Sequence, residues 1–409
     1  MNILVVNWTW YPSGGDFTYV ENICRLYSQH GHRVIPFSMK DERNAPTAYD
    51  DYFIENIDYK KVKRSLTAGI QVVMKSIYSF EAQRNLERLL SAVKIDVAHI
   101  NVIHHYITPT ILKILKEKNI PIIWTFHEYT PICPDSTFIS HGQVCEKCFG
   151  GAFYNCITHT CKKGSVLASA MAALENYVHS YLNYYAYVDH YICTSVFMYE
   201  KFKSFNFFRD KLVQLYHGYD YAEIETARLK PKQDEQKYIV FVGRLEKIKG
   251  AHTVLNAMRS LPGIRLKVIG DGTQEEELMA FKAHHHLDQV TFLGKKSKQE
   301  TLEIINGSEF LVCASEWYEV LGFTVVEAMA LSKPVIGSAI GAIPEMVIDQ
   351  HTGLLFEPGN AEQLAEKIKL LYENRDLIGQ MGKNAQLHIN QLINNDKHYQ
   401  GLQRLIPAL

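Results

Sequence analysis

The feature that most constrains the fold is a regular alternation of short apolar runs with stretches of helical spacing. In the first half, apolar runs at 1–7, 33–38, 97–101, 121–126 and 191–194 alternate with helical patterns over 18–30, 81–94, 108–118 and 166–189. The second half has apolar runs at 238–242, 266–269, 290–293, 310–313 and 334–337, and helical patterns over 250–260, 274–285, 298–306, 323–331 and 361–373. Apolar runs that alternate with helices in this way predict parallel sheets covered by helices on both faces.

The chain is too long for one hydrophobic core, because 409 residues exceed the size at which proteins usually divide into domains. The charged segment 221–237, which contains Pro231, separates the two halves. We therefore expect two Rossmann-like, doubly wound α/β domains that face each other across a cleft. The N-terminal domain is expected over 1–217, the C-terminal domain over 218–375, and terminal helices over 376–409 that return to the N-terminal domain.

Charge and hydropathy exclude several classes of protein. The net charge of −1 gives no general attraction to nucleic acid, and no apolar run is long enough to cross a membrane. The segment 1–7 has the pattern of a buried strand rather than a signal peptide, so we expect a cytoplasmic protein. A basic run at 60–64 (Lys60, Lys61, Lys63 and Arg64) fits a solvated helix face. The alternative interpretation of this basic run, together with the tyrosine-rich stretch 166–189, is that the protein contacts an anionic acceptor or the inner face of a membrane.

Ligands of doubly wound sheets bind beyond the carboxyl ends of the strands, and chemically informative residues follow the predicted strands. Gly243, Arg244 and Lys249 follow the run 238–242, where the two cations suit a diphosphate, although a surface loop with ordinary cations has the same pattern. Gly270 and Gly272 follow the run 266–269, where close approach to a ligand and a tight turn explain glycine equally well.

Two glutamates eight positions apart, Glu319 and Glu327, follow the run 310–313. Between them, Gly322-Phe323-Thr324 begins a predicted helix whose N-terminal N–H groups suit an anion. The neighbours of Glu327 are nearly all apolar, which favours a buried acid with a function over a solvated helix residue. In the first domain, Gly14-Gly15 follow the first strand and His127-Glu128 follow the run 121–126, although a lone histidine is more often structural.

Taken together, these residues resemble the retaining glycosyltransferases of family 4, which have the GT-B fold. The resemblance runs to about residue 375. It rests on Gly14-Gly15, His127, Gly243-Arg244 with Lys249, Gly270-Asp271-Gly272, the E-x7-E pair, the segment 337–345 and Gly353-Leu354-Leu355-Phe356.

The resemblance implies roles for individual residues. Arg244 and Lys249 would neutralise the diphosphate of a donor such as a UDP- or GDP-sugar. Glu319 would lie beside the donor sugar, Glu327 would bind the ribose, and His127 would lie near the 6-position of the sugar. Gly15 and the backbone of Leu321, Gly322 and Phe323 would meet the phosphates, with Gly243, Gly270 and Gly272 in the donor-binding loops. No divalent metal and no dedicated base are expected, because the leaving phosphate accepts the proton of a glycan or lipid-linked acceptor.

One departure concerns the donor pocket: the family commonly has Glu-Gly-Phe-Gly where this chain has Glu319-Val320-Leu321-Gly322, which leaves the identity of the donor sugar open. Bacterial surface polysaccharide or lipopolysaccharide assembly is the expected setting. The competing interpretations are an epimerase, hydrolase or phosphorylase of the same fold and a zinc-ribbon binding module, against which the balanced charge counts. A dinucleotide dehydrogenase lacks its G-x-G-x-x-G motif in the first strand-to-helix turn.

Five of the eight cysteines lie within 29 positions, and a reducing cytosol favours a metal over disulfides there. A C-x-x-C pair flanked by further thiols has the form of a structural zinc site, although reduced thiols packed in a loop remain the alternative. A subset of family 4 carries a similar insert, here about 131–165, and that resemblance selects Cys133, Cys145, Cys148 and Cys161. Cys156, His141 and His159 are alternates.

Overall fold

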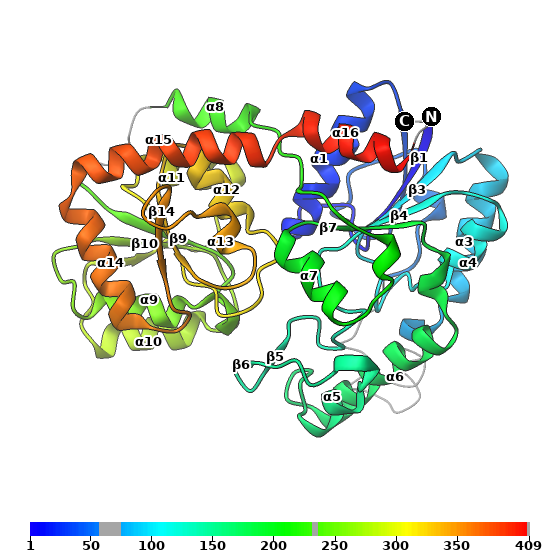
Figure 1. Ribbon diagram of the computed structural model, residues 1–409, viewed down its shortest axis with the longest axis horizontal. Coiled ribbons are helices and arrows are strands. Elements are labelled where there is room, and N and C mark those ends of the chain that lie inside the picture. Colours follow the sequence, from blue (N-terminus) through cyan, green and yellow to red (C-terminus); the bar gives the residue numbers. More distant parts are fainter. Residues whose placement is uncertain (57–74, 231–235, 407–409) are drawn as a thin grey trace. The chain divides into compact units, whose positions relative to one another are not determined.

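The computed structural model describes the chain except residues 57–74, 231–235 and 407–409, so the basic run at 60–64 lies outside the described residues. The chain forms two compact units, one made of Met1–Tyr219 with Asn395–Leu409 and the other of Asp220–Asn394. Each unit is built around its own six-stranded parallel sheet (Figure 1). Two parallel α/β units of this kind are consistent with the GT-B fold.

The sheet of the first unit has the strand order β2-β1-β3-β4-β7-β8. Its strands are β1 (Asn2–Val6), β2 (Arg33–Phe37), β3 (Val97–Ile100), β4 (Ile122–Thr125), β7 (His190–Cys193) and β8 (Leu212–Gln214). Its helices are α1 (Gly15–Gln29), α3 (Phe80–Ala92), α4 (Ile111–Glu117), α5 (Tyr154–Thr158), α6 (Val166–Tyr181), α7 (Val196–Ser204) and α16 (Asn395–Leu405). A short hairpin of β5 (Ile139–Ser140) and β6 (Gln143–Val144) precedes α5.

The central strands are apolar because both of their faces are covered. In β1, Ile3, Leu4, Val5 and Val6 have no exposed surface, and Leu4 pairs with Ile35 of β2 and with Ala98 of β3. The chain leaves β1 toward β2 on one side and later adds β3 on the other, so the strand order reverses between β1 and β3. Such a reversal is where doubly wound sheets open to bind ligands.

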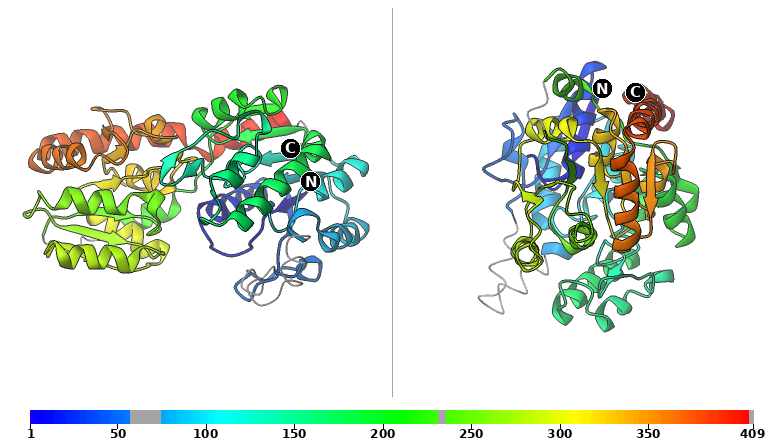
Figure 2. Two further views of the ribbon diagram at one scale, coloured as in Figure 1. Left: turned by 90° about the horizontal axis from the view of Figure 1, so that it is seen from below. Right: turned by 90° about the vertical axis from the view of Figure 1, so that its left-hand side faces the viewer.

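The sheet of the second unit has the order β11-β10-β9-β12-β13-β14. Its strands are β9 (Ile239–Val242), β10 (Leu266–Ile269), β11 (Val290–Phe292), β12 (Leu311–Cys313), β13 (Val335–Ser338) and β14 (Gly353–Phe356). Its helices are α8 (Ala222–Arg228), α9 (Ala251–Met258), α10 (Glu275–His284), α11 (Lys298–Gly307), α12 (Phe323–Ala330), α13 (Ile343–Met346), α14 (Ala361–Glu373) and α15 (Arg375–Leu392). Helices α9, α10 and α14 pack together, as do α11, α12 and α15 (Figures 1 and 2).

The helix expected over 166–189 is too long. In the structure α6 ends at Tyr181, and a separate 3₁₀ turn follows over Tyr184–Tyr187. Asn183 lies between them with φ of 54°, a left-handed conformation that asparagine tolerates and that ends a helix. Helical spacing of apolar residues continues across this break, which is why periodicity alone overextends the helix.

The C-terminal helix α16 belongs to the first unit. His398 of α16 lies 3.0 Å from the hydroxyl of Tyr19 in α1 and 2.7 Å from the carbonyl oxygen of Tyr216. The side-chain amide of Asn22 donates to Asn395 at 2.9 Å. The first unit is therefore completed by residues from both ends of the chain, whereas the second unit is continuous in sequence.

Candidate functional site

The strand order of the second unit reverses between β9 and β12, and the loops that follow these two strands meet there. Lys249 lies in a 3₁₀ turn, Lys247–Lys249, of the loop after β9, and Glu319 lies in the loop after β12. The Nζ of Lys249 is 2.5 Å from the Oε1 of Glu319. The two sequence-predicted residues thus form an ion pair at the topological switch point of this sheet.

Glu319 is buried, with 6% of its surface exposed, and its environment favours the ionised form. Burial by itself would raise the pKa of its carboxyl group. The charge of Lys249 and the hydrogen bonds from Lys249 and Ser315 outweigh that effect and lower the pKa overall. The hydroxyl of Ser315 donates to the same Oε1 at 2.6 Å, and Lys249 also lies 5.0 Å from the centre of the Trp317 ring.

Sequence reasoning missed Ser315. Its position directly after the strand β12 and four residues before Glu319 is the signal that could have identified it.

Backbone and side-chain bonds hold these loops together. The hydroxyl of Thr253 donates to Glu316 at 2.5 Å, and the N–H of Glu316 donates to the carbonyl of Ile248 at 2.8 Å. From the loop after β13, the N–H of Ala342 donates to the carbonyl of Glu319 at 2.9 Å. The carboxylate of Glu319 is therefore presented on a loop that is fixed on both sides, as a pre-organised site requires.

The glycines after β9 and β10 allow two loops to touch. Gly270 has φ of 140°, and a Cβ atom placed on it would collide with the carbonyl of Gly243. A Cβ atom on Gly272 would likewise collide with the backbone of Leu245, whose N–H donates to the carbonyl of Asp271 at 2.8 Å. Close packing of backbone therefore explains these glycines without any ligand.

Arg244 lies in the same loop as the ion-paired Lys249 but differs from it in environment. Its side chain is exposed and forms no ion pair with any residue that the structure describes. An exposed guanidinium beside the switch point has its five donors available to a phosphate group.

Glu327 lies in α12, is 3% exposed and forms an ion pair with Lys298, the first residue of α11. Sequence reasoning missed Lys298. A capping box formed by Ser297 and Glu300 marks the start of α11, and this S-x-x-E signal could have located Lys298 directly after the β11 loop.

The N-terminus of α12 is formed as the sequence predicts. Gly322 precedes it with φ of 89°, a left-handed conformation that glycine adopts without strain. Phe323 is the first helical residue. Val320 and Leu321, which replace the small and aromatic residues of the family pattern, are both buried.

In the first unit, His127 follows β4, and Gly15 is the first residue of α1 at the loop after β1. The Nε2 of His127 lies 3.0 Å from the amide oxygen of Asn101, which follows β3, so the assigned hydrogen bond requires a proton on Nε2. Its ring stacks on that of His217, with centroids 5.3 Å apart. Burial lowers the pKa of His127 to about 4, although Asp16 and Glu128 act to raise it, so the imidazole is neutral at pH 7. It can bind a hydroxyl group but carries no charge.

The cysteine-rich segment brings all five predicted thiols to one small cavity. It is lined by Cys133, Cys145, Cys148, Cys156 and Cys161 together with Pro134, Asp135, Phe138 and Ile139. All five are free thiols. Within the described parts of the chain, however, no three histidine, cysteine or acidic side chains are placed so that they could share a metal ion. The zinc site thus stays a prediction.

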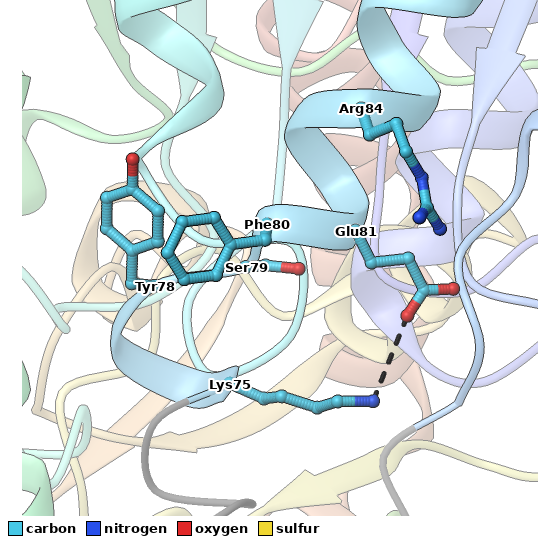
Figure 3. Close-up of a pocket in the computed structure, with 6 residues that line it drawn as sticks. All are labelled: Lys75, Tyr78, Ser79, Phe80, Glu81 and Arg84. Carbon is cyan, nitrogen blue, oxygen red and sulfur yellow. Dashed lines mark ion pairs between the residues drawn. The ribbon is translucent and has the colours of Figure 1, made fainter.

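A second pocket lies at the start of α3 (Figure 3). It encloses about 970 Å³ of space open to solvent and is lined by Lys75, Tyr78, Ser79, Phe80, Glu81 and Arg84. Lys75 and Glu81 form an ion pair at 3.9 Å across it. None of the predicted donor-binding residues lines this pocket.

The predicted residues therefore fall into two sets. Lys249 contacts Glu319, Gly243 contacts Gly270, and Glu327 pairs with Lys298, all within the second unit. His127 and Gly15 lie at the carboxyl edge of the first sheet, and their approach to the donor residues stays a prediction. A doubly wound sheet with cations and buried carboxylates at its switch point defines the class of α/β proteins that bind phosphorylated ligands at that edge.

The comparison with known proteins names the family. Residues 13–223 match the family described as Glycosyltransferase Family 4, and residues 223–388 match the family described as Glycosyl transferases group 1. The chain belongs to glycosyltransferase family 4.

The relatives of known sequence match over parts of their length. An uncharacterized glycosyltransferase of Methanocaldococcus jannaschii is 34% identical over 153 residues, which is 37% of this chain and 43% of that protein. A glycogen synthase of Mycobacterium tuberculosis is 30% identical over 163 residues, 39% of each chain. The chain spans about half the length, or less, of these curated relatives.

Solved structures share the fold over the whole chain. Anabaena HepE in complex with UDP and glucose has a TM-score of 0.69 at 16% identity, and sucrose-phosphate synthase of Thermosynechococcus elongatus has 0.69 at 20% identity. Both comparisons cover 100% of both chains. At such identities the likeness concerns the fold.

Proposed function

We propose that this protein is a retaining glycosyltransferase that moves a sugar, of the hexose type, from a nucleoside-diphosphate sugar to a glycan or lipid-linked acceptor. The setting we propose is bacterial surface polysaccharide or lipopolysaccharide assembly, on the cytoplasmic side. The observation that carries the proposal is the Lys249–Glu319 ion pair at the switch point of the second sheet, with exposed Arg244 in the same loop. Family membership and the UDP in the HepE structure agree with a nucleotide-sugar donor.

The chemistry follows from where charge develops. When the bond between the anomeric carbon and the diphosphate breaks, negative charge accumulates on the leaving phosphate, and fixed cations lower the energy of that state. Lys249 and Arg244 are assigned to this role, and the N-terminus of α12 at Gly322 and Phe323 adds N–H donors. Buried Glu319 is assigned to the hydroxyls of the donor sugar and buried Glu327 to those of the ribose.

Retention of configuration is assigned to attack from the face that the leaving group occupies. The leaving phosphate then accepts the proton of the acceptor hydroxyl, so no protein base is required. A neutral His127 suits this scheme, because it can bind a sugar hydroxyl without placing a positive charge beside the sugar that the phosphate leaves.

The first test is a thermal-shift panel with UDP, GDP, ADP, NAD and several nucleotide sugars. A ligand that binds only the folded state adds about 2.7 kcal/mol at a hundredfold excess over its Kd, so the matching nucleotide should raise the Tm clearly. Turnover with that donor, followed by NMR of the product, should show the anomeric configuration of the donor. A shift with NAD alone contradicts the proposal. Release of free sugar that no acceptor accelerates identifies a hydrolase, and a changed ring stereocentre without transfer identifies an epimerase. Inversion at the anomeric carbon of the transferred sugar contradicts retention.

We further propose that the cysteine cluster holds a structural zinc ion, with Cys133, Cys145, Cys148 and Cys161 as ligands. Around Cys148, the local core of this segment is small: Cys148, Phe153 and Cys156 pack with Ala173 of α6, and Ile157 and Cys161 lie against them. Five of its non-glycine residues nevertheless have φ between 45° and 71°: Ser136, Phe138, His141, Thr160 and Lys163. Such a strained backbone needs a further constraint, and four thiolates around zinc would supply it.

Metal analysis of the purified protein tests this second proposal. We expect about one zinc per chain, lost in Cys145→Ser and Cys148→Ser and retained in Cys24→Ser, a cysteine of α1 outside the cluster. Cobalt substitution should give a sulfur-to-metal charge-transfer band. Loss of metal in Cys156→Ser and not in Cys161→Ser would identify Cys156, rather than Cys161, as the fourth ligand. Metal-free protein whose Tm is unaffected by chelators would contradict the proposal.

A further inference from the structure

Helix α6 has its polarity reversed with respect to an ordinary surface helix. Its polar residues Glu175 and His179 are 2% and 0% exposed, and Ser169 and Asn176 are buried beside them. Its exposed side carries Val166, Leu167, Leu174, Tyr177 and Tyr181, of which Leu167 is 67% and Tyr181 88% exposed. An amphipathic helix on a soluble protein normally turns its apolar stripe inward.

The buried polar residues hold the helix in this orientation. The Oε2 of Glu175 is 2.5 Å from Nδ1 of His105, and its Oε1 accepts the backbone N–H of His105 at 3.0 Å. The Nε2 of His179 lies 2.8 Å from the carbonyl of Ile77. Rotating α6 to hide its apolar side would break these bonds and leave buried polar groups unpaired, which is costly.

The exposed side of α6 continues onto the cysteine-rich segment. The backbone N–H of Tyr154, at the start of α5, donates to the hydroxyl of Tyr177 of α6 at 3.0 Å. Tyr154 and the nearby Phe149 are exposed as well, and Figure 1 shows α5 and α6 packed together at one end of the first unit. We call the surface formed by Phe149, Tyr154, Val166, Leu167, Leu174, Tyr177 and Tyr181 the α5–α6 apolar surface.

The concentration of apolar side chains here is specific to this segment. Among the residues that the structure describes, sixteen large apolar side chains are exposed, and nine of them lie between Val144 and Leu182. Isolated exposed leucines need no explanation, but a contiguous group indicates a surface that is covered in use.

The charges around the surface distinguish between partners. Lys147 and Lys163 are exposed in the same segment. Its two glutamates offer little exposed negative charge, because Glu146 pairs with Lys201 at 2.6 Å and Glu175 is buried and hydrogen-bonded to His105. A second copy of the chain would bring lysines against lysines, whereas the anionic headgroups of a bilayer complement them. Tyrosines, moreover, favour the boundary between headgroups and acyl chains.

We propose that the α5–α6 apolar surface is a peripheral membrane-docking surface that inserts its leucines and aromatic rings at the interface of an anionic bilayer. The structure describes no helix long and apolar enough to span a membrane, so the contact proposed is a surface one. The proposal rests on α5, α6 and the loops beside them, and it does not depend on the proposed reaction.

Vesicle flotation with the full chain tests it. The probes are vesicles of phosphatidylcholine alone and of phosphatidylcholine with phosphatidylglycerol. We expect the protein to float with the anionic vesicles. The double variant Leu167→Glu/Leu174→Glu should bind at least about tenfold more weakly, because it places charge in the interface. Both leucines are exposed, so the fold should tolerate the change, which circular dichroism and the Tm of the variant would verify.

The matched control is Leu387→Glu, since Leu387 is 64% exposed on α15 of the second unit and is not part of the α5–α6 apolar surface. It should float like the unchanged protein. Lys147→Glu/Lys163→Glu should remove the preference for anionic vesicles. Absence of flotation, or equal flotation of the double leucine variant, overturns the proposal. So does a dimer in light scattering that Leu167→Glu/Leu174→Glu dissociates, since a second copy would then be the occupant.

Discussion

At the scale of single residues, the ion pair between Lys249 and Glu319 carries most of the functional argument. The ε-ammonium group compensates a carboxylate that is almost entirely buried, and Ser315 satisfies the same oxygen. Removing one partner of a buried pair leaves an uncompensated charge, so both activity and stability depend on it.

Lys249→Ala should reduce transfer by about a hundredfold or more, the cost of losing one electrostatic contact to a developing anion. Lys247→Ala is the matched control, because Lys247 is an exposed cation two positions away in the same 3₁₀ turn. Steady-state kinetics with the donor identified by thermal shift provide the measurement, with circular dichroism to verify the fold. Near-normal turnover of Lys249→Ala, or an equal loss in Lys247→Ala, would mean that the site is assigned wrongly.

The same reasoning applies to Glu327. Glu327→Ala should abolish transfer while the fold persists, because the role assigned to it is a ligand contact. If Glu327 serves only to hold α12 against Lys298 of α11, the variant instead lowers the Tm and leaves the KM for the donor unchanged. Measuring both quantities separates the two cases.

At the scale of elements, α16 closes the first unit by placing His398 in a cluster of buried rings around Tyr19. His99, His127, His217 and His398 all lie against Tyr19. Burial lowers the pKa of each, to about 4 for His127 and His398 and well below the ordinary value for His99 and His217. For His99 and His217 the neighbouring histidines add to this effect.

This cluster predicts acid sensitivity. In the unfolded chain these imidazoles take up protons near pH 6.5, whereas in the folded protein they stay neutral until about pH 4 or lower. The unfolded state therefore binds more protons between these values, and the free energy of unfolding should fall as the pH drops from about 6.5 to about 4. Urea unfolding at a series of pH values measures this, and His398→Gln should flatten the slope. An identical slope in the variant would contradict the assignment.

At the scale of the whole molecule, the two units differ in how the chain builds them. The second unit is the single stretch Asp220–Asn394, and the first needs Asn395–Leu409 in addition to Met1–Tyr219. We expect a fragment of residues 220–394 to fold cooperatively and to bind the same nucleoside diphosphate as the full chain, as calorimetry would show. A fragment ending at residue 219 should unfold at lower urea than the first unit does in the full chain, because it exposes the rings that α16 covers. A 220–394 fragment that folds without binding nucleotide would place the donor site elsewhere.

Much of this architecture is determined locally and is readable from the sequence. Runs such as Ile3 to Val6 are apolar because both faces of their strand are covered, and glycines such as Gly322 stand where the backbone turns left-handed. Strand ends, helix starts and the loops that bear Lys249, Glu319 and Glu327 follow from such patterns. The end of α6 does not follow from such a pattern, because the helical spacing of apolar residues continues past Asn183.

Tertiary structure decided which side chains meet. Lys249 pairs with Glu319, seventy residues away, because the strand order places β9 beside β12. Glu327 pairs with Lys298 because α12 packs against α11, and no local pattern encodes either arrangement. The same holds for the reversed polarity of α6: its periodicity identifies a helix, but only packing against His105 and Ile77 determines that the polar side faces inward. Sequence periodicity reports which residues share a face, and long-range contacts choose the face that is buried.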